Sequence, residues 1–288
     1  MKLSIVICCY SMARELPRTL RSLAPGAQRG IGPEDYEIIV IDNGSPEPMS
    51  EAVVHAAAAN ARLIRLDEAR PSPCVAMNWG LREARAPLIG AMIDGARMAS
   101  PGLAAGAIKA SRLARRPLVL TLGFHLGPKM QMDSVAEGYD RAAEDALLAS
   151  VDWERDGYRL FDISVLAGSS KNGWFQPINE SNALFTTTDL WDELGGFDEA
   201  FESPGGGCVN LDLLVRAVSL PRVQAITLLG EGTFHQVHGG VATNAPRVAN
   251  RPFFEEYERI RGYPFRTPSY ESLYIGNIPP RIPGAPCQ

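Results

Sequence analysis

The sequence lacks the marks of a membrane or secreted protein. Nowhere do roughly 18 uncharged apolar residues follow one another, and the apolar stretch near the start, LSIVICC, is short for a signal peptide and too short for a membrane span. The five cysteines form no C-x-x-C pair, which indicates reduced core residues rather than a disulfide framework. We therefore expect a cytoplasmic protein without a transmembrane segment, either free or peripheral at the inner face of the membrane.

Positive charge is scarce as well. Lys and Arg number 28 against 33 Asp and Glu, which gives a net charge of −5 at pH 7. This balance provides no basic field to attract a nucleic-acid backbone or an anionic membrane surface. We expect no nucleic-acid partner, and any bound phosphate must be held by a few local groups.

Three common motifs are missing. A dinucleotide site needs G-x-G-x-x-G after the first strand, because the backbone must approach a pyrophosphate closely, but CCYSMARE at this place contains no glycine. The Walker sequence G-x-x-x-x-G-K-[ST] and the hydrolase elbow G-x-S-x-G are absent too. The sequence therefore gives no support to a dinucleotide fold of the usual kind, a P-loop ATPase or a nucleophilic serine.

The chain has instead a regular alternation of apolar strands and amphipathic helices up to about residue 115. The strand patterns lie at residues 3–10, 36–42, 61–66 and 88–94, and the helix patterns at residues 11–23, 51–60, 75–85 and 103–114. This alternation predicts one α/β domain with a mostly parallel central sheet and helices on both faces. With 288 residues and 45% hydrophobic content, the chain is large enough for such a core.

Beyond residue 117 the alternation weakens. We expect strands at residues 118–124 and 223–230, helices around residues 137–150, 188–196 and 210–218, and a loop rich in glycine, asparagine and proline at residues 166–182. From about residue 264 the chain is rich in proline and aromatic residues. We expect this C-terminal extension to wrap around the domain or to form a lid.

Polar residues follow the expected strands of the first half. Tyr10, Asp42, Asp67 and Asp94 stand where these strands end. In open α/β sheets ligands bind beyond the carboxyl ends of the strands. We therefore expect these four loop starts to line one nucleotide site.

Five segments carry a resemblance to a known family. They are SIVICCY, EIIVIDNGS, CVAMNWGLREARAPLIGAMID, NALFTTTDLWDELGGFDEAF and NLDLLVR, between residue 3 and about residue 216. In this order they resemble the glycosyltransferases of the GT-A fold, especially the large family 2. The resemblance implies a single GT-A domain over residues 1–263, with a nucleotide-binding half at 1–100 and an acceptor-side half at 101–263, followed by the tail at 264–288.

The resemblance also implies an activity and site residues. A member of this family transfers a hexosyl or N-acetylhexosaminyl group from a nucleoside diphosphate sugar of UDP or GDP type, and we expect a glycan, lipid-linked or small-molecule hydroxyl acceptor, as in polysaccharide biosynthesis. By resemblance Asp42 contacts the nucleotide base, and the loop around Asn78 faces the donor. Asp94 begins the Asp-x-Asp element that meets ribose and metal.

Two acids of the family pattern are missing here. Ala96 stands where the second acid of Asp-x-Asp is expected, and Arg97 follows it; Asn210 stands where inverting members carry their general base. A carboxamide cannot accept a proton at neutral pH. This absence favours retention, in which the leaving phosphate can take the proton. If the enzyme inverts, Asp212 or Glu180 is the remaining base.

Two histidines suggest a rebuilt metal site. NLDLLVR is similar to N-L-E-L-S-F-R of retaining N-acetylgalactosaminyltransferases, in which a histidine about one strand later binds the metal. His235 stands at the corresponding place and His238 follows three residues on. Asp94 and the two histidines are thus the expected ligands of Mn²⁺ or Mg²⁺, which would stabilise a leaving diphosphate. Alternatively, Arg97 supplies fixed charge, because a guanidinium binds phosphate oxygens bidentately without a metal.

Most of these residues also have a structural interpretation. Asp42 and Asp94 are typical of turns. Asn210 is typical of a helix N-cap, and Asp212 and Arg216 have the i, i+4 spacing of a helical ion pair. These alternatives stay open from the sequence alone.

Two other functions deserve comparison with a glycosyltransferase. The first is a catalytically degenerate GT-A protein that binds nucleotide sugars or serves in assembly, because the second acid and the base are missing. The second is a sugar-phosphate nucleotidyltransferase on a related fold. The latter is disfavoured because the first strand-to-helix loop lacks the glycine- and basic-rich signature.

Overall fold

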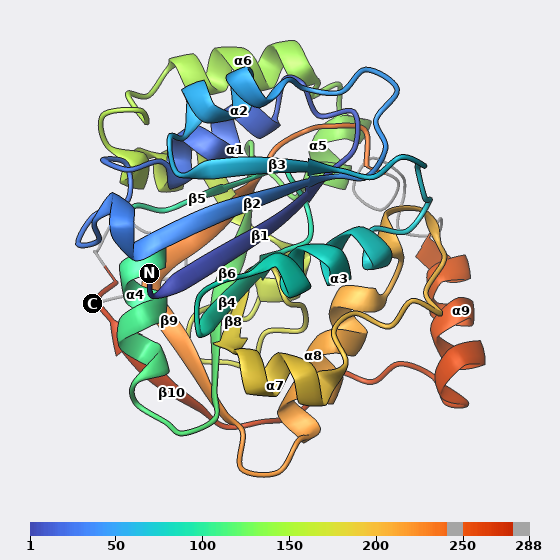
Figure 1. Ribbon diagram of the computed structural model, residues 1–288. Coiled ribbons are helices and arrows are strands. Elements are labelled where there is room, and N and C mark those ends of the chain that lie inside the picture. The colour runs from blue at the N-terminus through green and yellow to red at the C-terminus, as the bar shows by residue number, and fades with distance from the viewer. Residues whose placement is uncertain (241–249, 279–288) are drawn as a thin grey trace.

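The computed structural model describes residues 1–240 and 250–278 (Figure 1). The strands are β1 (Leu3–Cys9), β2 (Tyr36–Asp42), β3 (Ala61–Arg65), β4 (Leu88–Met92), β5 (Arg97–Ala99), β6 (Pro117–Leu126), β7 (Ser164–Leu166), β8 (Leu184–Thr187), β9 (Gln224–His235) and β10 (Ser272–Gly276). The α-helices are α1 (Leu16–Leu23), α2 (Glu51–Ala57), α3 (Cys74–Glu83), α4 (Leu103–Ser111), α5 (Gln131–Ala136), α6 (Arg141–Ala149), α7 (Thr188–Leu194), α8 (Val209–Ser219) and α9 (Arg251–Arg261). Within the described ranges, none of these helices is long and apolar enough to cross a membrane.

The first four strands form the predicted parallel layout. β1 pairs in parallel with β2 and β4, and β2 pairs with β3. Ile5 and Ile7 of β1 pack with α1 and α2, whereas Val6 and Cys8 pack with α3 on the other face. Successive side chains of a strand point to opposite faces, so a strand with apolar residues on both faces must be covered on both. Figure 1 shows α1 and α2 on one side of this half-sheet and α3 on the other.

The second half of the sheet departs from a purely parallel arrangement. The strand order is β10-β9-β6-β8-β4-β1-β2-β3, and β8 runs antiparallel between β4 and β6. The short strand β5 pairs antiparallel with β9, which places Arg97 opposite His235. The sequence did not predict β5 or β8, because three or four residues are too few to show a period. β5 nevertheless brings the Asp94 loop to the end of β9.

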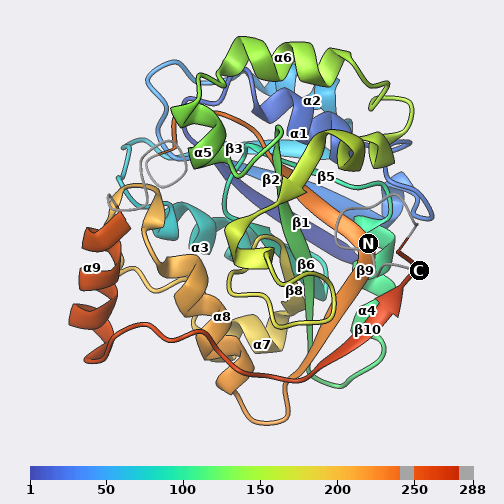
Figure 2. The ribbon, with the colours of Figure 1, turned by 180° about the vertical axis from the view of Figure 1, so that it is seen from behind.

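The C-terminal segment reaches the outer edge of the sheet (Figure 2). After α9, which the sequence did not predict, the chain runs to β10, and β10 pairs in parallel with β9. On the way, the hydroxyl of Tyr270 donates to the carbonyl of Ile178 at 3.1 Å and accepts from its N–H at 3.0 Å. Residues 279–288 of the predicted tail lie outside the described residues.

Candidate functional site

Asp94, His235 and His238 meet beyond the carboxyl ends of β4 and β9. Nε2 of His235 lies 2.7 Å from Oδ2 of Asp94. Nε2 of His238 lies 3.2 Å from Nε2 of His235 and 3.4 Å from Oδ2 of Asp94. The three residues predicted as metal ligands are therefore brought together, although Asp94 and His235 are 141 positions apart in the chain.

Neighbouring groups orient two of these side chains. Oδ1 of Asp94 accepts the N–H of Ala96 at 2.9 Å, so this carboxylate forms a turn and still presents Oδ2 to the histidines. Oε1 of Gln131 lies 2.6 Å from Nδ1 of His235. An amide oxygen only accepts, so when Nδ1 donates to Gln131, Nε2 of a neutral His235 presents its lone pair on the side of Asp94.

The charge states follow from burial and proximity. Burial lowers the pKa of His235 to about 4, and the carboxylate of Asp94 only partly opposes this. Burial by itself would raise the pKa of Asp94, but His238 and His235 hold it well below its usual range. For His238 the carboxylate outweighs burial and the pKa is raised. At neutral pH Asp94 is ionised and His235 is neutral.

The three atoms fit a divalent cation. Ligand atoms bound about 2.1 Å from one metal ion, at right angles to each other, lie about 3 Å apart, and here the separations run from 2.7 to 3.4 Å. At 2.7 Å, Nε2 of His235 and Oδ2 of Asp94 need a shared proton or a shared metal ion, because a lone pair and a carboxylate oxygen repel each other. Two imidazoles and one carboxylate form a donor set that suits Mn²⁺ better than Mg²⁺, which prefers oxygen ligands.

Arg97 lies beside this cluster. It is opposite His235 in the β5–β9 register and is 6% exposed. One terminal nitrogen lies 3.7 Å from Oε1 of Glu180, whereas Nε and the other terminal nitrogen are buried and have no hydrogen-bond partner among the described residues. Buried N–H groups are rarely left open in folded proteins. Open guanidinium N–H groups are suited to phosphate oxygens.

Glu180 and Asn210 continue the site from Arg97 towards α8. Nδ2 of Asn210 donates to Oε1 of Glu180 at 3.4 Å, and Oδ1 of Asn210 is buried without a partner in the described part of the chain. Asn210 is the second residue of α8 and Cys208 occupies the N-cap, so the N-cap interpretation of Asn210 is wrong. The carboxylate of Glu180 is 24% exposed, which leaves it accessible to an acceptor.

Asp42 and Tyr10 lie at the carboxyl ends of two neighbouring strands, β2 and β1. Asp42 ends β2 opposite Cys9 of β1, and Tyr10 follows with 47% of its surface exposed. Oδ1 of Asp42 accepts both the N–H and the hydroxyl of Ser45, at 2.9 and 2.6 Å. Its Oδ2 is buried and has no partner among the residues described. Asp42 thus forms the turn that was the structural alternative and keeps one oxygen open to a ligand.

The structure contradicts the prediction made for Asn78. It lies inside α3 and not in a loop, and its Nδ2 donates to the carbonyl of Phe197 at 2.8 Å and to Oε1 of Glu199 at 2.9 Å. Its Oδ1 accepts the N–H of Phe197 at 2.8 Å. These bonds tie α3 to the chain that follows α7. The expected donor-facing loop around Asn78 is therefore wrong, and the side chain has a structural role.

The structure also contradicts the prediction made for Asp212. It is 1% exposed, and its Oδ2 accepts from Nε of Arg216 at 2.7 Å, the helical pair that was the structural alternative. Arg261 of α9 donates to Oδ1 at 2.5 Å and to Oδ2 at 2.7 Å. Both oxygens are held by guanidinium groups that do not deprotonate. This occupation contradicts the predicted role of Asp212 as a base.

Asp212→Asn should act on stability and not on chemistry. The substitution leaves Arg216 and Arg261 without the charge that they share, and breaking such a largely buried pair costs about 3 kcal/mol. Urea denaturation should show this loss in the free energy of unfolding, while turnover per folded molecule stays near that of the wild type. Unchanged stability with a large loss of turnover would return Asp212 to the catalytic residues.

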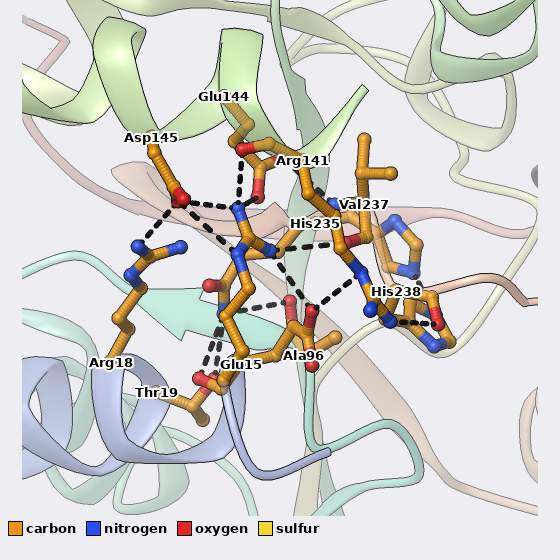
Figure 3. A network of polar contacts seen from close by, with 12 residues as sticks. Glu15, Arg18, Thr19, Ala96, Arg141, Glu144, Asp145, His235, Val237 and His238 are labelled. Atoms are coloured by element: carbon orange, nitrogen blue, oxygen red, sulfur yellow. Dashed lines mark hydrogen bonds and ion pairs between the residues drawn. The ribbon is translucent and has the colours of Figure 1, made fainter. Parts of the chain in front are cut away.

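Sequence reasoning missed the groups that support the histidines. Gln131 gave no signal, because it is one polar residue in a short helix. Arg14 and Glu144 lie in a network of charged side chains between α1 and α6, near His235 and His238 (Figure 3). Glu144 stands beside Asp145 in α6, yet it is 0% exposed. Periodicity alone does not tell which of two neighbouring acids is buried.

The chain is similar to known glycosyltransferases in sequence. Residues 4–94 match the family model "Glycosyl transferase family 2". Validoxylamine A glucosyltransferase of Streptomyces hygroscopicus subsp. limoneus is 26% identical over 229 residues, which cover 76% of this chain and 49% of that protein. The chain therefore spans about half the length of the curated relatives that it matches.

Solved structures show the same architecture. S. aureus TarS 1-349 in complex with UDP-GlcNAc matches with a TM-score of 0.58 at 14% identity, over 90% of this chain and 65% of that one. The mannosyltransferase PcManGT from Pyrobaculum calidifontis, in complex with GDP-Man and Mn2+, matches with a TM-score of 0.55 at 17% identity, over 93% of this chain and 66% of that one. The chain has the GT-A fold. The segment matched by the family model ends at Asp94. The finer likeness to retaining N-acetylgalactosaminyltransferases stays a prediction.

Proposed function

We propose that the protein is a metal-assisted glycosyltransferase that moves a sugar from a nucleoside diphosphate sugar to a hydroxyl acceptor. The observation that carries this proposal is the convergence of Asp94, His235 and His238 beside the open N–H groups of Arg97. A site for a divalent cation lies beside the fixed positive charge of Arg97, and together they suit a diphosphate. The structural neighbours bind UDP-GlcNAc, and GDP-Man with Mn2+, which supports a donor of this class.

The donor is held by groups at both ends of the site. The open Oδ2 of Asp42 accepts an N–H of the nucleotide base, and Tyr10 covers the base from the neighbouring strand end. Arg97 donates to phosphate oxygens. A divalent cation held by Asp94, His235 and His238 would, when bound, offset the negative charge that builds on the leaving diphosphate.

Glu180 is the base in this proposal, since Asp212 is occupied. The carboxylate takes the proton of the acceptor hydroxyl, and the acceptor oxygen forms a bond to the anomeric carbon. The bond from that carbon to the diphosphate breaks, and its electron pair stays on the phosphate oxygen. A terminal nitrogen of Arg97 lies 3.7 Å from this carboxylate, so the base stands beside the group that binds the phosphates. A single displacement of this kind inverts the configuration, and the acceptor is a glycan, a lipid-linked sugar or a small molecule.

The degenerate scaffold remains the competing function, because Ala96 and Asn210 replace two acids of the family pattern. Ala96 is 0% exposed and its N–H orients Asp94, so the second acid is replaced by a core residue. Two imidazoles complete the ligand set in its place. A scaffold that had only lost function would have no reason to keep three ligand atoms within 3.4 Å.

Release of nucleoside diphosphate from UDP- and GDP-sugars tests the proposal directly. We expect release with Mn²⁺ and a hydroxyl acceptor, and at least about tenfold less with Mg²⁺, because two of the three ligands are nitrogens. A donor that binds but is not turned over with any acceptor class would favour the degenerate scaffold. Pyrophosphate release from a nucleoside triphosphate would instead indicate a nucleotidyltransferase.

A further inference from the structure

The chain after His235, up to His238, has no regular secondary structure to hold it. His235 is the last residue of β9, and the residues after it belong to no strand or helix. Gln236 donates its N–H to the carbonyl of Ala96 at 2.9 Å, which ends the backbone pairing with the β5 side. We call residues 235–238 the histidine turn. Buried backbone groups in such a turn need partners from side chains.

Charged side chains from two helical regions provide these partners (Figure 3). Oε2 of Glu144, on α6, accepts the N–H of Val237 at 2.8 Å, and Arg14, just before α1, donates to the carbonyl of Val237 at 3.2 Å. Arg141 donates to the carbonyl of His238 at 3.3 Å. The peptide groups on both sides of Val237 are thus fixed, one position before His238.

Arg14 and Glu144, which we call the clamp, are charged groups that are costly to bury. Glu144 is 0% exposed, and burial raises its pKa to about 7 although the N–H of Val237 and the guanidinium of Arg14 oppose this. Arg14 also binds Glu144 at 3.1 Å and the 1% exposed Glu15 at 2.9 Å. Apolar residues of similar volume often stabilise a fold as well as buried ion pairs do. Apolar residues could not, however, form hydrogen bonds to both the N–H and the carbonyl of Val237.

We propose that Arg14 and Glu144 are positioning residues of the metal site, which hold His238 at the distance from Asp94 and His235 that a shared ion requires. The inference rests on the metal site of the proposed function and extends it to residues that touch no ligand. Groups that orient metal ligands typically change metal affinity by about 10- to 100-fold when they are lost. The clamp should therefore set affinity for the ion, and not the chemistry once the ion is bound.

The test is the Mn²⁺ dissociation constant, measured by electron paramagnetic resonance without donor, for the wild type, Glu144→Gln and Glu144→Ala. We expect about 10- to 100-fold weaker binding in Glu144→Ala and a smaller loss in Glu144→Gln, whose amide oxygen can still accept the N–H of Val237, with wild-type kcat recovered at saturating Mn²⁺. Glu144→Gln keeps the side-chain volume and guards against loss of the fold. Asp145→Asn is the matched control: Asp145 binds Arg14 and Arg18 at 2.6 Å but makes no bond to the histidine turn, and asparagine keeps an acceptor oxygen. Its Mn²⁺ affinity should equal that of the wild type.

The outcomes separate the two proposals. Tight binding by the wild type with equal binding by Glu144→Ala overturns the clamp and leaves the metal site. An equal loss in Glu144→Ala and Asp145→Asn also overturns it, because general packing of α1 against α6 would then explain both. No Mn²⁺ binding by the wild type would remove the metal site itself, and the clamp with it.

Discussion

Asp94→Asn is expected to lower Mn²⁺-dependent turnover by roughly 100-fold or more, because the cation loses its single charged ligand while the leaving group still needs several kcal/mol of charge stabilisation. The substitution keeps the oxygen that accepts from Ala96, so the turn and the fold are retained. His235→Ala should have an effect of similar size. The same variants should lose Mn²⁺ binding in the absence of donor, which steady-state kinetics and titration with Mn²⁺ together measure.

His55→Ala is the matched control for the histidine variant. His55 is an exposed residue of α2, and it should leave both Mn²⁺ affinity and turnover unchanged. Arg97→Ala should weaken donor binding without removing its dependence on Mn²⁺. If Arg97→Ala abolished turnover while Asp94→Asn retained it, the arginine would supply the charge alone and the cation site would be wrong.

Glu180→Gln should lower kcat by about 100- to 10,000-fold, the usual contribution of a general base, because the amide cannot take the proton of the acceptor hydroxyl. Donor affinity should change little, since Glu180 meets Arg97 only at 3.7 Å. Rapid-quench measurement of a single turnover separates this loss of chemistry from slow product release.

A second substitution sharpens the test of the base. Asn210 lies 3.4 Å from Glu180, and the family resemblance assigns an acid of inverting members to its position, so Asn210→Asp in the Glu180→Gln background should restore part of the rate. A Glu180→Gln variant with wild-type kcat would rule out this base. Retention of configuration, with the proton taken by the leaving phosphate, would then be the better account.

Much of the fold followed from local patterns in the sequence. The strands of the first half have apolar residues on both faces and therefore need helices on both, and the polar residues that follow them were expected to meet at the carboxyl ends of the sheet. Asp94 and His235 were predicted as partners by resemblance, and the structure places their side chains 2.7 Å apart. The predicted parallel half-sheet and the GT-A fold are confirmed.

The remaining site residues depended on partners that no local pattern reveals. Asn78 and Asp212 were predicted to act on ligands, yet Asn78 binds Phe197 119 positions away and Asp212 binds Arg261 49 positions away. Strand β5, which aligns Arg97 with His235, has three residues and no period of its own. Glu144 is buried where α6 meets Arg14 and the histidine turn. Such pairings depend on tertiary structure, which single-sequence periodicity does not encode.

The most direct measurement is isothermal titration of UDP, GDP and their sugars into the protein, once with Mn²⁺ and once with EDTA. The account predicts that one nucleotide class binds with Mn²⁺ and that EDTA weakens this binding strongly, leaving the residual affinity due to Arg97 and Asp42. Binding of equal strength in EDTA would contradict a metal site at Asp94, His235 and His238, and the absence of binding to every nucleotide would contradict the assignment of a donor site altogether.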